Sequence, residues 1–274
     1  MKQGYLTTLK LGRLGRFCNG AYQIAAVLGI AKKNNLEPVF PRWINHLHRD
    51  EFGSTEDVDL YKHFVHELPP IPEGIDWQPE IQIPWGYSDV RLPPGNWNLT
   101  GYFQSSKYFD DCRDQIQHYF RMKDEPPLND YCAIHVRLGD YDDLYHPRLP
   151  LEYYEAAMLE FSQSQRFLVF SDDIPEAKRI FAARSNVQWE YLEYSEGRDY
   201  IADFKLLKTC RHFIVANSSY SAFAAVLGEA KDKKVVAPRP WFGPVYGGIT
   251  GEDIYEPNWK VLDWQKGCDP KVLR

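Results

Sequence analysis

The chain has 274 residues, of which 44% are hydrophobic and 26% are charged, a globular composition long enough for one large or two modest α/β domains. Because 32 Lys and Arg stand against 38 Asp and Glu, the net charge is −6 and no general basic field is available to hold nucleic acid. The longest mainly apolar stretch, 21–31, falls far short of the roughly 20 apolar residues of a membrane span. We expect neither a nucleic-acid partner nor a membrane span.

The N-terminal segment MKQGYLTTLKLGRLGR has no apolar core of the kind that a secretory signal needs. The cysteine count is odd and no CxxC pair occurs, which argues against a disulfide framework and against structural zinc. Reduced thiols in a cytoplasmic protein are expected. The aromatic content of 15% fits ordinary packing or a sugar-binding cleft, and composition does not decide between them.

The first half of the chain mixes helical and strand-like runs with a long Pro-, Trp- and His-rich middle, 41–95. Its run PPIPEGIDWQPEIQIPWG contains too much proline for a regular helix and predicts a surface excursion. KDEPPLND, 123–130, interrupts the patterns on both sides and indicates a linker. We expect two domains, 1–125 and 126–274, with an irregular tail from Trp241 that could pack back on the first domain.

From Tyr131 the chain alternates short apolar runs with amphipathic ones. Strands are predicted at 131–137, 166–171, 212–218 and 233–238, and helices at 150–164, 174–184, 198–210 and 219–231. This alternation is typical of βαβ units with a parallel sheet. Since open parallel sheets bind ligands beyond the carboxyl ends of their strands, the residues directly after each strand are the first candidates for a site.

The first of these strands runs into HVRLGDY, residues 135–141. Apolar and polar residues alternate here, which places His135 and Arg137 on one face of an extended segment. A guanidinium at the carboxyl edge of a sheet suits a phosphate or diphosphate, because its charge is permanent and its N–H groups form a fork. The alternative is a surface ion pair between Arg137 and Asp140.

The second strand ends in FSDD, residues 170–173, and a helix follows. Ser171, Asp172 or Asp173 accounts for the N-cap, with Pro175 near the first turn. A cap does not require two adjacent aspartates, so the surplus carboxylate is a candidate acceptor for a base edge or ribose hydroxyls.

The third strand ends in NSSYS, residues 217–221, at the start of an apolar helix. Small hydroxylated residues at such a junction expose backbone N–H groups at a positive helix end, which favours an anion, although capping alone explains one serine. The three junctions thus carry a cation, a diacid and a hydroxyl-rich helix start. A nucleoside diphosphate needs this combination.

Five segments resemble the motifs of the α-1,2-fucosyltransferases, glycosyltransferase family 11, and they follow one another along the chain in the family's order and spacing. HVRLGDY is similar to the HxRRxD motif, and FSDD to the family's FSDD segment. Residues 203–221, from DFKLL through Cys210 and His212 to ANSSYS, are similar to the run D-x-x-L-M…C…H…A-N-S-S-F-S. GYFQSSKYF, 101–109, resembles GYFQSEKYF, and GRFCNGAYQ, 15–23, resembles GRLGNQMFQ.

The resemblance implies an α/β fold of GT-B type, with two Rossmann-like domains facing across a cleft and an irregular N-terminal one. It implies metal-independent, inverting transfer of fucose from GDP-fucose to a sugar hydroxyl, usually the 2-OH of a galactose, with no cofactor. Residues 1–125 would form the acceptor side and 126–274 the GDP-sugar side.

Site roles carried over by position place Arg137 on the β-phosphate of the leaving GDP and Asn19, on an N-terminal loop, facing the reacting sugar. The remaining donor-site residues would hold the guanosine or border the diphosphate. They are His135, Ser171, Asp172, Asp173, Asn217, Ser218, Ser219 and Tyr220.

The chain departs from the family pattern at two motifs. Leu138 replaces the second Arg of HxRRxD, and Cys18 and Gly20 replace a Gly and a Gln of the N-terminal motif. With one cation lost, transfer from another GDP-sugar, or a weakened enzyme, stays open beside GDP-fucose. The general base is also open: Asp140 is a candidate that could instead orient Arg137. Other candidates are Glu51, Glu56, Asp57 and Asp59.

Three alternative functions compete with this interpretation. Asp140-Tyr141-Asp142 matches the D-x-D of metal-dependent GT-A glycosyltransferases, but such triplets are common by chance. A non-catalytic carbohydrate-binding protein would explain the aromatic content and leave the strand-end anion sites without a purpose. A nucleotide-dependent dehydrogenase is disfavoured because no GxGxxG follows the first strand.

Overall fold

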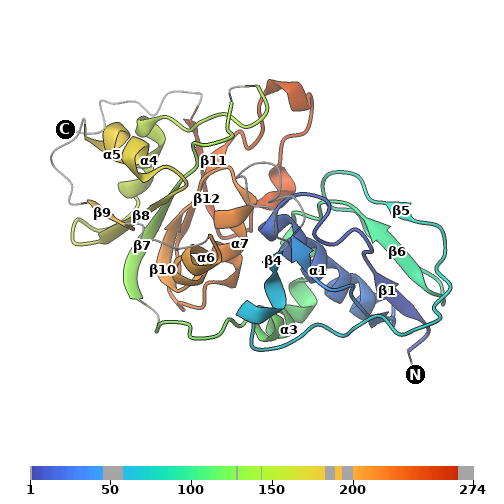
Figure 1. Cartoon of the computed structure of the whole chain (residues 1–274). Helices are drawn as coiled ribbons and strands as arrows, with labels where there is room; N and C mark the ends of the chain where they lie inside the picture. The colour runs from blue at the N-terminus through green and yellow to red at the C-terminus, as the bar shows by residue number, and fades with distance from the viewer. Residues whose placement is uncertain are drawn as a thin grey trace. The chain divides into compact units, whose positions relative to one another are not determined.

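The computed structural model describes residues 2–45, 58–127, 129–142, 144–182, 189–192 and 200–264. The chain divides into two compact units, Met1–Asp124 and Glu125–Arg274 (Figure 1). Each unit is built on a parallel sheet that carries helices, so the predicted α/β class with two Rossmann-like domains is confirmed. The cleft expected between them stays a prediction.

Unit 1 contains a four-stranded parallel sheet in the order β2–β1–β6–β5. Its strands are β1 (Tyr5–Thr7), β2 (Glu37–Pro38), β5 (Ile81–Gln82) and β6 (Trp97–Thr100). The long helix α1 (Phe17–Lys33) follows β1, and 14 of its 17 residues are buried. Helix formation fits its composition, since it contains four alanines and no proline.

The remainder of unit 1 consists of short elements. β3 (Ile44–Asn45) pairs antiparallel with β4 (Val58–Asp59), and the 3₁₀ turn η1 (Leu60–His63) follows. After β6 come η2 (Ser106–Tyr108), η3 (Asp110–Cys112) and α3 (Arg113–Tyr119). The proline-rich middle therefore does more than the surface excursion predicted for it, because it contributes β5 to the sheet.

Unit 2 contains a six-stranded parallel sheet in the order β12–β11–β10–β7–β8–β9. The strands are β7 (Asn129–Val136), β8 (Arg166–Ser171), β9 (Trp189–Tyr191), β10 (Cys210–Ile214), β11 (Val235–Arg239) and β12 (Lys260–Asp263). The helices are α4 (Leu151–Met158), α5 (Ile174–Phe181), α6 (Tyr200–Lys208) and α7 (Ser219–Leu227). Two 3₁₀ turns, η4 (Pro244–Tyr246) and η5 (Glu252–Ile254), complete the unit.

The four strands and four helices predicted for this half are present, most of them shorter than predicted. The tail is less irregular than expected, because β12 extends the sheet by pairing along β11 from Val236↔Lys260 to Arg239↔Asp263. As far as Trp264 the described tail thus belongs to unit 2; residues 265–274, with Cys268, lie outside the described part of the chain. β9, at the other edge, was also missed.

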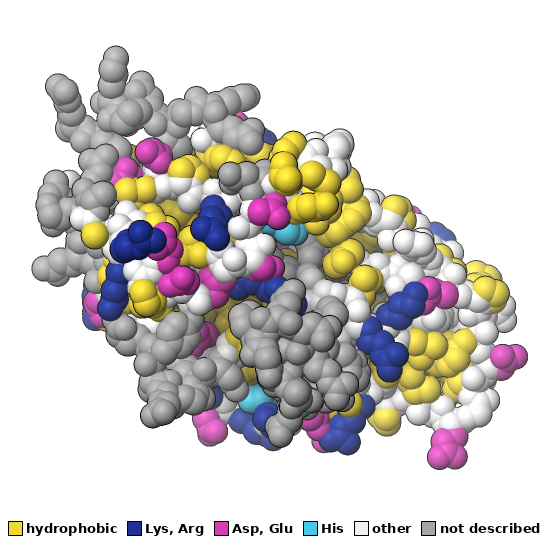
Figure 2. Space-filling model, turned by 45° about the horizontal axis from the view of Figure 1, so that its top comes forward, with side chains coloured by type: hydrophobic (Ala, Val, Ile, Leu, Met, Phe, Trp, Pro, Cys, Tyr) yellow, Lys and Arg dark blue, Asp and Glu magenta, His cyan; other side chains and the backbone are white. Residues whose placement is uncertain are grey.

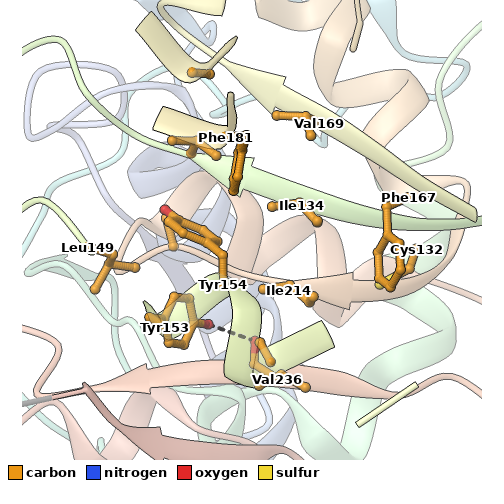
Figure 3. Packing of buried hydrophobic residues seen from close by; sticks show 14 of the residues in the cluster. Cys132, Ile134, Leu149, Tyr153, Tyr154, Phe167, Val169, Phe181, Ile214 and Val236 are labelled. Carbon is orange, nitrogen blue, oxygen red and sulfur yellow. Dashed lines mark hydrogen bonds between the residues drawn. The ribbon is translucent and has the colours of Figure 1, made fainter. Parts of the chain in front are cut away.

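One hydrophobic core of unit 2 lies between the sheet and α4 and α5 (Figure 3). Ile134, Val169 and Ile214 come from three neighbouring strands, and the rings of Tyr154 and Phe181 pack edge to face at 5.6 Å. The hydroxyl of Tyr153 donates to the carbonyls of Val215 and Val236, at 2.7 and 3.2 Å, so this buried phenol is satisfied. The packed core fixes the strands whose ends form the candidate site.

Candidate functional site

The three strand ends singled out in the sequence lie side by side. β10, β7 and β8 are consecutive and parallel, with Ile134 in register with Ile214 on one side and Val169 on the other. Because parallel strands end at the same edge, the residues that follow Val136, Ser171 and Ile214 are brought together. The site is therefore one edge of one sheet within unit 2.

Arg137 is the centre of this edge. Its Nη1 lies 2.7 Å from Oδ2 of Asp172, its Nη2 pairs with Asp140, and its guanidinium lies 5.6 Å from the ring centre of Tyr141. Its side chain is only 14% exposed. Burial alone would lower the pKa of Arg137, but Asp172 and Asp140 outweigh burial and raise it. The ion pair offered as an alternative is thus present, and it holds a permanent cation at the predicted position.

Asp172 fixes the backbone of the loop that carries Arg137. Its Oδ1 accepts from the N–H of Leu138 at 2.9 Å, and its Oδ2 accepts from the N–H of Gly139 at 2.8 Å. A Cβ on residue 139 would lie 2.7 Å from that same Oδ2, so a side chain there would displace this carboxylate. The surplus carboxylate predicted from FSDD is already engaged within the chain.

The other two polar residues of FSDD stabilise the start of α5. Asp173 is the N-cap and accepts from the N–H of Glu176 at 2.9 Å. Oγ of Ser171 accepts from the N–H of Asp173 at 3.0 Å. Contacts of Ser171, Asp172 and Asp173 with a guanosine stay a prediction.

His135 is buried beneath the edge. Its Nδ1 lies 2.9 Å from Oγ of Ser221, and its ring centre lies 5.4 Å from that of Tyr220. Burial lowers the pKa of His135 to about 3, although the nearby Asp172 opposes this shift. The imidazole is therefore neutral at physiological pH, with one nitrogen able to donate and the other able to accept.

The start of α7 forms the third side of the edge. Ser218 is the N-cap and accepts from the N–H of Tyr220 at 3.3 Å, while Ser219 begins the helix. The hydroxyl of Tyr220 donates to the carbonyl of Tyr200 at 2.5 Å, so this side chain holds α6 rather than standing open. The backbone N–H groups of the first turn remain as the anion-binding feature of a helix start.

Asn217 ties this junction to two loops. Its Nδ2 donates to the carbonyls of Pro147 and Trp241, at 3.0 and 3.2 Å, and its own carbonyl accepts from the hydroxyl of Tyr141 at 2.8 Å. Its side chain is 1% exposed, and its Oδ1 has no hydrogen-bond partner among the described residues. Tyr141, which joins Arg137 to Asn217, was not singled out from the sequence. Its place directly after Asp140 was the signal that could have found it.

Unit 1 brings the two N-terminal motifs together at its own sheet. Asn19 lies in the first turn of α1, not on a loop as expected, and its Oδ1 accepts from Nε2 of Gln104 at 2.6 Å. Gln23 joins the same two motifs, because its Nε2 donates to the carbonyls of Leu14 and Gly101 at 3.0 and 3.2 Å. Whether Asn19 faces a reacting sugar stays a prediction.

The departures in the N-terminal motif have structural reasons. Cys18 is 3% exposed, and burial raises the pKa of its thiol well above the usual value. A Cβ at Gly20 would lie 2.8 Å from Nε1 of Trp43, so the indole occupies the space of a side chain. Both residues belong to the packing of α1.

The carboxylates left open as general base have varied surroundings. Asp140 is 44% exposed and pairs with Arg137, and Asp59 accepts from the N–H of Tyr61 at 3.1 Å and pairs with Arg42. Glu51, Glu56 and Asp57 lie outside the described residues. The base is therefore not identified by these contacts.

The two aspartates of the D-x-D triplet point to different partners. Asp140 pairs with Arg137, whereas Oδ1 of Asp142 accepts from the N–H groups of Leu144 and Tyr145 at 2.8 and 2.7 Å. Within the described part of the chain, no group of three or more His, Cys, Asp or Glu side chains is arranged to hold a metal ion.

On the face shown in Figure 2, Lys and Arg side chains lie among Asp and Glu side chains rather than in one basic area. None of the described helices combines the length and apolar character needed to cross a membrane.

The model of the family described as glycosyl transferase family 11 matches residues 88–263. The match includes all three strand ends and begins after the N-terminal motif at 15–23.

Two curated relatives are from Escherichia coli. The O-antigen biosynthesis glycosyltransferase WbnK is 33% identical over 170 residues, 53% of this chain and 55% of that protein. An alpha-1,2-colitosyltransferase is 26% identical over 170 residues, 54% of this chain and 57% of that protein. The chain spans little more than half the length of the curated relatives it matches.

Among solved structures, the fucosyltransferase NodZ from Bradyrhizobium gives a TM-score of 0.49 at 11% identity, covering 83% of this chain and 94% of that one. POFUT1 in complex with GDP gives 0.48 at 13% identity, covering 86% of this chain and 98% of that one.

Proposed function

Because the chain belongs to glycosyl transferase family 11, as its motifs predict, we propose that this glycosyltransferase moves fucose from GDP-fucose to a sugar hydroxyl of a glycan acceptor. The acceptor position proposed is the 2-OH of a galactose, and the setting is glycan biosynthesis in the cytoplasm. The observation that carries the proposal is the cation of Arg137, fixed by two carboxylates at a sheet edge beside the start of α7.

The proposed mechanism rests on charge at the departing diphosphate. The acceptor oxygen attacks the anomeric carbon, the bond from that carbon to the phosphate oxygen breaks, and its electron pair stays on GDP. Arg137 and the N–H groups of the first turn of α7 stabilise the negative charge that develops there. A base removes the proton of the attacking hydroxyl. A fixed guanidinium supplies the positive charge at the diphosphate, so we propose that no metal is required.

Another GDP-sugar is the second candidate donor. Two observations favour it: Leu138 stands where the family motif has an arginine, and one relative is named for colitosyl rather than fucosyl transfer. Both candidates use the same edge of unit 2 for GDP and differ only in the transferred sugar.

A panel of GDP-sugars tests the proposal. The purified chain is incubated with each donor and a galactose-terminated acceptor, with and without EDTA, and GDP release and the glycosylated product are both measured. We expect transfer from GDP-fucose that survives EDTA. Loss of turnover on chelation, restored by Mn²⁺, would favour a metal-dependent enzyme that uses the D-x-D triplet. Sugar binding without any binding of GDP would favour a non-catalytic carbohydrate-binding protein.

A further inference from the structure

Two aromatic side chains follow neighbouring parallel strands of unit 1. β5 and β6 run level, with Gln82 in register with Thr100, and Trp85 and Tyr102 come shortly after these ends. Their rings are stacked, with centres 4.5 Å apart and planes 9° from parallel. Both side chains are partly exposed. The carboxyl edge of this sheet therefore carries a paired aromatic surface that water reaches.

The backbone around Tyr102 is firmly held. The N–H of Ile83 donates to the carbonyl of Thr100 at 2.7 Å, which continues the pairing of the two strands past their ends. Phe103 is 3% exposed and has a φ of 52°, a left-handed conformation that is costly for an aromatic residue. The buried ring of Phe103 anchors the backbone in this conformation directly after Tyr102.

Stacking for core packing looks different in the same unit. The rings of Phe17, Trp43 and Phe64 are also stacked, at 5.4 and 5.5 Å, but these side chains are 2–4% exposed. Trp85 and Tyr102 make a comparable stack at the surface. An aromatic stack in contact with water offers a flat apolar face on which a ligand with its own apolar face can pack.

Two polar side chains, Gln104 and Ser105, follow this aromatic pair closely in the chain. A pyranose has C–H faces that pack on aromatic rings and a rim of hydroxyls that need hydrogen bonds. Gln104, two residues after Tyr102, is paired with Asn19, so an amide couple lies at the same carboxyl edge. Ser105 is 1% exposed, and its Oγ has no partner among the described residues.

We propose that Trp85 and Tyr102 form the platform on which the acceptor sugar binds, with one C–H face of a pyranose against an outer face of the stacked pair and the second ring supporting the first from behind. This assignment rests on the proposed function, since it supplies the acceptor side of that reaction. It names the acceptor class as a sugar with an open apolar face, such as a galactoside, and it places the subsite on unit 1. Unit 2 keeps the nucleotide.

The test compares Trp85→Ala and Tyr102→Ala with the wild type. At saturating GDP-sugar we expect kcat/KM for the acceptor to fall about tenfold in each variant, mostly through KM, since one stacked ring is lost. GDP affinity by calorimetry and the rate of GDP-sugar hydrolysis without acceptor should not change. Trp85→Phe and Tyr102→Phe keep a ring and should recover most of the loss, which also covers the case in which an alanine variant fails to fold.

Trp97→Ala is the matched control. Trp97 is a partly exposed tryptophan at the amino end of β6, where its Nε1 donates to the carbonyl of Pro93 at 2.9 Å. Its loss should leave the KM for the acceptor unchanged. An unchanged acceptor KM in folded Trp85→Ala and Tyr102→Ala would overturn the platform, as would an equal rise in Trp97→Ala.

Direct titration separates the platform from the reaction. Methyl β-galactoside is added to the chain without any nucleotide, and saturation-transfer NMR records contact with the sugar. Contact that is lost in Trp85→Ala supports the platform even if no GDP-sugar is turned over, in which case only the proposed function fails. No contact in the wild type, together with active transfer, would place the acceptor elsewhere and overturn the platform alone.

Discussion

Replacing Asp172 by alanine tests whether this carboxylate acts through Arg137 or touches the nucleotide base. The change removes two hydrogen bonds from the N–H groups of Leu138 and Gly139 and one ion pair with Arg137. Hydrogen bonds to a charged group contribute about 1.5–3 kcal/mol each, and water replaces part of this at a side chain that is 17% exposed. We expect the free energy of unfolding to fall by about 3 kcal/mol.

The binding readout distinguishes the two roles. If Asp172 holds Arg137 in place, the variant should bind GDP about tenfold more weakly, because the cation at the diphosphate loses an anchor, while guanosine should bind as before. Asp172→Asn, which keeps one acceptor oxygen without the charge, should fall between the wild type and the alanine variant. Calorimetry with GDP and with guanosine measures both affinities on one protein sample.

A second ion pair, at the opposite end of β8 from Asp172, serves as control. Arg166, at the amino end of β8, pairs with Glu190 at 3.0 Å, and both side chains are about half exposed. Glu190→Ala should change stability by less than about 1 kcal/mol and leave GDP binding unchanged. The reasoning is refuted if Asp172→Ala weakens guanosine and GDP equally, or if it unfolds at the same denaturant concentration as the wild type.

Three further predictions concern the strand β7 and its end. Arg137→Ala should lower kcat/KM for the GDP-sugar by about 10²–10³-fold in a protein that stays folded but melts at a lower temperature, because two carboxylates lose their partner; Arg137→Lys should recover part of both losses. More than about a third of wild-type activity would make Arg137 only an ion-pair partner. Leu138→Arg should destabilise the fold by about 3 kcal/mol or more in denaturant unfolding without raising activity, because Leu138 is 4% exposed in the core; a stable, more active variant would contradict this. The pKa of His135 is about 3 in the folded protein and near 6.5 in the unfolded chain. Below pH 6.5 the unfolded chain therefore takes up a proton that the folded protein does not, and the free energy of unfolding falls with the pH. Between pH 6.5 and 4 the wild type should therefore lose about 1.4 kcal/mol per pH unit more than His135→Gln, and equal slopes would show that the folded imidazole takes up the proton.

The edge that carries the site could be predicted from the sequence because its three strands are continuous apolar runs. Strands buried on both faces of a parallel sheet need such runs, and each ends in polar residues at 137, 172 and 217. The order β10–β7–β8 is not readable from a single chain, since it depends on pairing between distant segments. The common edge was predictable nevertheless, because all strands of a parallel sheet end on the same side.

The elements that were missed have few residues and depend on a neighbour. β9 and β12 have three and four residues at the two borders of the sheet, and each is defined by its hydrogen bonds to one adjacent strand. A short border strand has no strong periodicity of its own, so its sequence reads as a loop. Asp172 was singled out from the sequence, but its partners Leu138 and Gly139 were not, because they lie 34 and 33 residues away in the chain.

Leu138, which stands in place of the second motif arginine, is a core residue of unit 2. Alternation along 134–138 places Leu138 on the face opposite His135 and Arg137, and the structure buries it in the core with Val136 and Leu149. The position therefore contributes packing in this chain. At the edge itself one cation, Arg137, stands between two carboxylates, so the described side chains of this cluster sum to one negative charge. A diphosphate bound there must draw its remaining stabilisation from the backbone N–H groups at the start of α7, which makes the geometry of that helix start as important as the arginine.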